Sequence, residues 1–167
     1  MRANPTSDDG PTPRAFVIGW QEWVALPDLA LPAIKAKIDT GARTSALHAH
    51  DIEVFEGAAG ELVRFKVWPA RRRQDIEIAC VAAVIDRRIV TSSNGESERR
   101  YVIATRMAMG GREWPIEVTL TDRSQMSYRM LLGRQAMQAG MMIDATSAFR
   151  QPRLSYRLYG RRRQTTK

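Results

Sequence analysis

Apolar and polar residues alternate with a period of two along most of the chain, which is the pattern of half-buried β-strands. In AIKAKID (33–39), Ile34, Ala36 and Ile38 share one side and the two lysines share the other. The same alternation recurs in LVRFKVW, DIEIACVAAVI and REWPIEVTL. The pattern therefore predicts a chain built mainly of strands, each with one face in a core.

Turn signals separate these strands. EGAAGE (56–61), SSNGES (92–97) and MGGRE (109–113) are typical hairpin connections, with Asn94-Gly95 the strongest signal among them. GRQAMQAG (133–140) is the one stretch that we expect to be helical. The sequence thus predicts a small all-β domain, barrel-like or sandwich-like, with one short C-terminal helix.

The chain has 167 residues, which is the size of one domain. We expect a disordered leader at 1–14, because it has no apolar core and three prolines, a domain at 15–159, and a basic tail at 160–167. No stretch approaches the roughly 18 consecutive apolar residues of a membrane span. Together with the absence of a signal-peptide pattern, this makes a cytoplasmic protein without a membrane partner the expectation.

Cysteine count and charge narrow the possible classes. The single cysteine, Cys80, lies in an apolar run and is expected in the core, and it excludes an internal disulfide or a multi-cysteine zinc site. The net charge of +8 attracts polyanions such as nucleic acid, anionic lipid or acidic peptides. Charge alone does not choose among these partners.

Asp39 raises the question of chemistry, because it ends an apolar strand and opens a turn of small residues. Thr40 offers a hydroxyl, Gly41 allows the backbone to approach closely, and Ala42 adds little bulk. Taken alone, the turn favours the simpler explanation, an aspartate that caps it through its side chain.

A longer sequence pattern favours a catalytic role for Asp39. The stretch DTGARTSAL (39–47), the later MLLGRQAM (130–137) and a hairpin between them (87–103) resemble the retropepsin-like aspartic peptidases. With KAKIDTGARTSALHA, LLGR and MIDA, the chain is most similar to a bacterial branch labelled "ATP-dependent zinc protease", which often accompanies RimK-type glutamate ligases. The resemblance implies a small closed barrel and a peptidase that removes glutamate residues added by such ligases.

The resemblance also assigns roles. Two chains would form a homodimer, each bringing one Asp39 to a shared catalytic dyad, with Thr40 and Gly41 bracing the carboxylates. Structural support behind the loop would come from Leu131, Leu132, Gly133 and Arg134. No cofactor is expected.

Departures from the viral members favour an acidic or polyglutamylated peptide as substrate. Arg43 follows the turn where viral retropepsins have acidic residues, and the hairpin tip SSNGE is polar and flanked by arginines. Arginine forks bind carboxylates well. The expected substrate-binding residues are Ala42, Arg43, Thr44, His48, Arg87, Arg88, Ser93 and Asn94.

Three alternatives stay open. His48 and His50 could hold zinc with Asp39 or Asp51, although the His-Glu-x-x-His motif is absent. Basic clusters such as ARRRQ (70–74) could bind nucleic acid, a reading that leaves the DTG and LLG motifs unexplained. A degenerate retropepsin-like domain could serve only for dimerisation or binding. The sequence has no phosphate-binding loop, so we expect no use of ATP.

Overall fold

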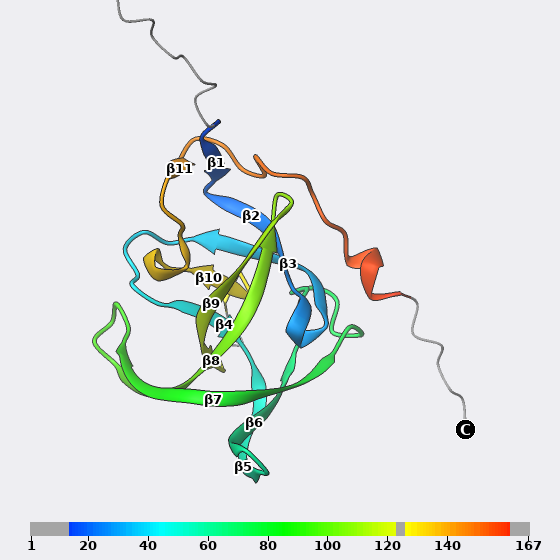
Figure 1. Ribbon diagram of the computed structural model, residues 1–167, viewed down its shortest axis with the longest axis vertical. Coiled ribbons are helices and arrows are strands. Elements are labelled where there is room, and N and C mark those ends of the chain that lie inside the picture. Colours follow the sequence, from blue (N-terminus) through cyan, green and yellow to red (C-terminus); the bar gives the residue numbers. More distant parts are fainter. Residues whose placement is uncertain (1–13, 123–125, 161–167) are drawn as a thin grey trace, which may run out of the picture.

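The computed structural model describes residues 14–122 and 126–160, and within them the fold is almost entirely β (Figure 1). Strands β1 to β6 are Phe16–Gly19, Gln21–Leu26, Leu31–Ile38, Ser45–His48, His50–Gly57 and Gly60–Val67. Strands β7 to β11 are Ile78–Thr91, Ser97–Met109, Arg112–Thr121, Met130–Leu132 and Met141–Asp144. Three short 3-10 helices complete the described elements: η1 (Pro27–Leu29), η2 (Arg134–Ala136) and η3 (Tyr156–Tyr159).

Six of these strands close into a barrel in the order β2-β3-β10-β4-β9-β8. The ring is completed where β2 pairs with β8, through Ala25 and Ala108. Strands β7, β6 and β5 continue from β8 as an antiparallel extension, whose last hairpin projects below the barrel in Figure 1. The predicted small closed barrel is therefore confirmed.

The core is made by the alternating positions that the sequence indicated. In β3, Ile34 and Ala36 are fully buried, whereas Lys37, the residue after Ala36, is exposed. Burial of each large aliphatic side chain stabilises the fold by about 1.5–3 kcal/mol. Cys80 is also buried, as predicted, and burial raises the pKa of its thiol to about 12.

The predicted helix at 133–140 is shorter in the structure than expected. Only η2, one turn of 3-10 helix, forms there, and the chain is already extended again at Met137. The carbonyl of Ala136 accepts a hydrogen bond from the Trp114 indole at 2.9 Å, so a tertiary contact fixes the turn. Glycines at both ends of the stretch oppose a longer helix.

The C-terminal segment wraps back over the barrel, as the orange and red trace in Figure 1 shows. Strand β11 pairs in parallel with β1, and the fully buried Glu22 accepts hydrogen bonds from the backbone of Gly19 and Arg150, both at 2.8 Å. The Tyr159 hydroxyl donates to Ala33 O at 2.6 Å. These contacts bring η3 against β3.

Most of the predicted leader and tail, residues 1–13 and 161–167, lies outside the described residues. Among the described helices, none has the length and apolar character needed to cross a bilayer.

Candidate active site

The Asp39 turn connects β3 to β4 and holds its carboxylate in place through the backbone. The amide of Gly41 donates to Asp39 Oδ1 at 3.1 Å, and the amide of Ala42 donates to Asp39 O at 3.2 Å. A side chain on residue 41 would place its Cβ 3.2 Å from that carboxylate oxygen. The Thr-Gly-Ala sequence is thus what allows a backbone donor to reach Asp39.

The LLG segment braces this turn from behind. Strand β10 inserts between β3 and β4, parallel to the first and antiparallel to the second. The amide of Asp39 donates to Leu132 O at 2.9 Å, and the amide of Gly133 donates to Ser45 Oγ at 3.0 Å. Immediately after it, Arg134 donates through its amide to Ala42 O at 2.9 Å and through its guanidinium to Thr40 O at 2.8 Å. Arg134 therefore holds the turn by its backbone carbonyls.

Gly133 has no room for a side chain, which gives a stability prediction. A Cβ there would lie 2.5 Å from Thr44 O, a backbone atom, whereas a Cβ at Gly41 meets only a carboxylate oxygen at 3.2 Å. We expect Gly133→Ala to destabilise the fold by about 1–3 kcal/mol, because the loop and β10 must separate. Gly41→Ala is the matched control and is expected to cost less. Urea unfolding of both variants measures the difference, and equal costs would contradict this packing.

A hairpin lies across a cavity from the turn. Strands β7 and β8 meet at Ser92–Glu96, where the amide of Ser92 donates to Glu96 O at 2.8 Å and Gly95 takes a positive φ of 85°. The cavity has a volume of about 340 Å³. Its lining combines the turn, the hairpin and the strands below: Asp39, Gly41, Ala42, Thr44, Ala46, Val90, Thr91, Ser92, Ser93, Arg100 and Leu131. The predicted hairpin therefore faces the candidate catalytic residue.

Arg100 is the basic residue in the described lining of this cavity, and the sequence pattern did not assign it to substrate binding. It is only 6% exposed, and its Nε donates to Glu98 Oε2 at 2.9 Å. The Thr121 hydroxyl donates to the same oxygen at 3.0 Å, so Glu98 is fixed from two sides. The ion pair uses Nε alone, which leaves the two Nη groups as further donors. Arg100 thus places a buried guanidinium, which is suited to bind a carboxylate, in the same cavity as Asp39.

The structure does not bring Arg87 and Arg88, the two hairpin arginines predicted to bind substrate, into this cavity. Arg87 pairs with Glu61 at 2.6 Å, and Arg88 pairs with Asp86 and Glu117 at 2.9 and 2.8 Å. These carboxylates raise the pKa values of both arginines, with Glu61 the largest cause for Arg87 and Glu117 for Arg88. Both guanidinium groups are thus engaged by carboxylates of β6, β7 and β9.

The remaining predicted ligands are divided between the cavity and other places. Ala42, Thr44 and Ser93 line it, whereas Arg43 and Asn94 are exposed residues of the turn and the hairpin tip that do not. His48 is fully buried on β4, which separates it from the cavity surface.

Neither histidine belongs to a group of metal ligands in the described part of the chain. His50 is bonded through Nε2 to Glu77 at 3.1 Å and stacks on Trp68 with ring centroids 3.7 Å apart. Asp51, a proposed third ligand, pairs with Lys66 at 3.1 Å. Among residues 14–122 and 126–160, no three His, Cys, Asp or Glu side chains are close enough to hold a metal ion.

The cavity contains one carboxylate per chain. Within the described part of the chain, Asp39 is the only acidic residue of its lining. One carboxylate can act as a base or as an acid at a given moment but not as both, and peptide hydrolysis by carboxylates needs both. The cavity of a single described chain therefore lacks a second carboxylate that could take the complementary role.

Comparison with known proteins identifies a protein family that matches most of this chain. A family model described as RimB-like, "Retropepsin-like aspartic endopeptidase RimB", matches residues 17–154. Two relatives named "Probable alpha-L-glutamate ligase", from Shewanella pealeana and Shewanella halifaxensis, are each 48% identical over 134 residues, which cover 80% of this chain and 29% of the relative. One from Desulfotalea psychrophila with the same name is 44% identical over 128 residues, or 77% of this chain and 28% of its own length.

The chain therefore spans less than a third of the length of these curated relatives. A crystal structure of a Legionella pneumophila protein of unknown function has the same fold, with a TM-score of 0.68 and 26% sequence identity. That similarity covers 81% of this chain and 97% of the Legionella chain.

Proposed function

Because this chain belongs to the RimB-like family of retropepsin-like aspartic endopeptidases, we propose that it is a homodimeric peptidase for glutamate-rich or polyglutamylated peptides. The observation that carries the proposal is the position of Asp39, which lies on a braced turn opposite a hairpin with no second acidic residue among the described lining of the cavity. A second copy of the chain supplies the missing carboxylate, because two-fold symmetry brings the same residue from each protomer.

The chemistry follows from two carboxylates in contact. Two carboxyl groups in contact do not both ionise readily, because their negative charges repel each other. The pair of Asp39 side chains therefore holds one proton. The ionised carboxylate takes a proton from a water between them, and the water attacks the scissile carbonyl. The protonated partner donates its proton to the carbonyl oxygen. The amide of Gly41 fixes the orientation of each carboxylate.

An acidic substrate is supported by charge and by the relatives. The chain carries a net charge of +8, Arg43 is exposed directly after the turn, and Arg100 lies in the cavity. The relatives are named for glutamate ligation, and this chain matches only a part of each of them. A peptidase of this family that acts on glutamate chains fits that association.

The direct test is incubation with tetraglutamate, followed by mass spectrometry of the products. We expect shorter glutamate peptides or free glutamate, and unchanged rates with a chelator, because the carboxylates need no metal. A tetraglutamine peptide of the same length is the matched control and is expected to be cleaved far more slowly. Absence of cleavage of tetraglutamate would contradict the substrate assignment, and activity lost with chelator and restored by zinc would contradict the mechanism.

A further inference from the structure

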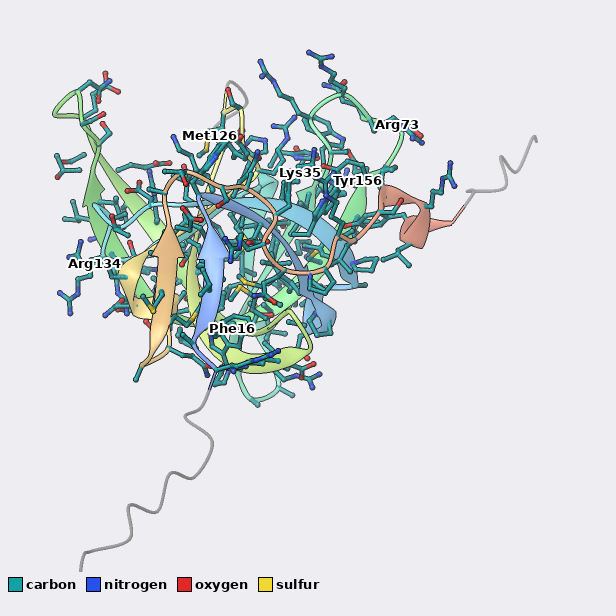
Figure 2. The ribbon with its side chains drawn as sticks, turned by 90° about the horizontal axis from the view of Figure 1, so that it is seen from above. Phe16, Lys35, Arg73, Met126, Arg134 and Tyr156 are labelled. Carbon is teal, nitrogen blue, oxygen red and sulfur yellow. The ribbon has the colours of Figure 1, made fainter. Side chains whose placement is uncertain are left out.

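A second cavity, which we call the basic cavity, lies apart from the Asp39 turn. It has a volume of about 370 Å³, and its lining includes Lys35, Arg71, Arg72, Arg73 and Arg129. No acidic residue belongs to that lining in the described part of the chain. Figure 2 shows Lys35 and Arg73 grouped near Tyr156, well away from Arg134, which is bonded to the Asp39 turn. The basic cavity is therefore a separate feature of the surface.

Arg129 is the residue that most strongly indicates that this cavity binds an anion. It is 5% exposed, and its Nε and Nη1 have no hydrogen-bond partner among the described residues. Its Nη2 reaches only Arg71 O, at 3.5 Å. A guanidinium stays charged in a protein, and a buried charge without a counter-charge is costly. Burial, and then the charge of Arg71, lowers the pKa of Arg129. The described lining of the cavity thus lacks a negative charge beside the buried guanidinium of Arg129.

The other cations differ in how far they are already engaged. Arg73 forms a two-pronged pair with Asp75, at 2.9 and 2.8 Å, and Lys35 lies over the Trp23 ring at 5.2 Å. Arg71 and Arg72 are exposed on the loop before β7, and no ion pair within 4 Å involves either of them in the described residues. The exposed side chains of Arg71 and Arg72 and the buried guanidinium of Arg129 are therefore available to an anion.

The shape of the surface favours an extended ligand. A larger hollow adjoins the basic cavity, shares Lys35, Arg73 and Tyr156 with it, and adds Arg157. A chain carrying several negative charges can follow these cations from one hollow into the next, whereas a single small ion would occupy only one point.

The aromatic rings of the basic cavity are engaged within the protein. Tyr156 packs edge-on against Trp23, with centroids 4.9 Å apart. Tyr128 donates its hydroxyl to Gln21 at 2.9 Å and packs edge-on against Trp20. Single-stranded nucleic acid binds through rings that are free to stack on bases. The contacts therefore favour carboxylates over nucleotides.

We propose that the basic cavity binds carboxylates of an acidic peptide, with Arg129 pairing one side chain and Arg71 and Arg72 its neighbours. The site is distinct from the Asp39 cavity and would hold an acidic chain at a distance from the bond that is cleaved. Its identification as a peptide site rests on the proposed function, whereas the need for an anion at Arg129 does not.

The test measures binding of tetraglutamate by calorimetry at low salt, in an Asp39→Asn, Arg100→Gln background, so that no turnover occurs and binding in the Asp39 cavity is weakened. We expect Arg129→Gln, and separately the double variant Arg71→Gln with Arg72→Gln, to weaken this binding at least about tenfold. The matched control Arg64→Gln removes an exposed arginine on β6 and is expected to change the affinity less than about twofold. Arg129→Gln also removes an uncompensated buried charge, so its thermal stability should equal or exceed that of the parent.

Equal binding by the parent, Arg129→Gln and the Arg71/Arg72 double variant would overturn the proposal. So would Arg129-dependent binding of inorganic phosphate or of a single-stranded oligonucleotide in preference to tetraglutamate. The outcome is separable from the proposed function. A protein that binds tetraglutamate through Arg129 but does not cleave it in the Asp39 parent would contradict the peptidase and support this site.

Discussion

Replacing Asp39 by asparagine is expected to lower peptide hydrolysis by at least about 10³-fold while leaving the fold intact. An asparagine keeps the side-chain oxygen that accepts from the Gly41 amide at 3.1 Å. It cannot take a proton from water, and general acid–base steps by a positioned group contribute about 10²–10⁴-fold each. In the proposed dyad both roles fall on this residue, one in each protomer, so the loss should be larger than for a residue that only binds substrate.

Asp51→Asn is the matched control for this prediction. Asp51 is an exposed carboxylate on β5 that pairs with Lys66, outside the Asp39 cavity. Its change to asparagine is expected to alter the rate of tetraglutamate cleavage less than about twofold. A large loss in Asp51→Asn with a small one in Asp39→Asn would move the chemistry to the histidine strand, where Asp51 would be a metal ligand.

Arg100→Gln should have the second largest effect, on substrate recognition. If Arg100 pairs with a substrate carboxylate inside the cavity, truncation of this buried partner costs about 2–5 kcal/mol, or roughly 30- to 5,000-fold in kcat/KM. The effect should appear with tetraglutamate and be small with tetraglutamine, so the proposed preference for glutamate should decrease. Arg100→Lys retains a positive charge and is expected to recover part of the loss.

Arg88→Gln controls for the charge of the hairpin. Arg88 lies directly across the strand pair from Arg100, yet its guanidinium is bonded to Asp86 and Glu117. Its loss should change kcat/KM by about threefold or less, since a partly exposed pair contributes little. Equal effects of Arg88→Gln and Arg100→Gln, or an unchanged glutamate preference in Arg100→Gln, would contradict the role given to Arg100.

Local motifs explain why much of the site could be predicted from the sequence. Asp39, Gly41 and Gly133 are confined to one arrangement by close backbone contacts, so their residue types reveal the turn and its brace. The alternating strands likewise reveal the barrel, because each inward face must be apolar. Which arginine enters the cavity was not predictable in this way.

The arginines depend on the register of the hairpin. In β8, both Val102 and Ile103 are buried, so alternation does not tell which face Arg100 occupies. A bulge between Val84 and Asp86 then sets Arg88 opposite Arg100. The ion pairs of Arg87 and Arg88 use Glu61 and Glu117 from two other strands, which only the folded sheet brings close. Long-range pairing of this kind leaves no local signal.

Mixing wild-type protein with Asp39→Asn is the most direct test of the shared dyad. After subunit exchange with a ninefold excess of the variant, about one wild-type chain in ten pairs with another wild-type chain, if both chains associate equally. We therefore expect tetraglutamate cleavage per wild-type chain to fall about tenfold, because a mixed dimer has only one ionisable carboxylate. An unchanged rate per wild-type chain, with exchange verified by native mass spectrometry, would show that each chain works alone and would contradict the shared dyad.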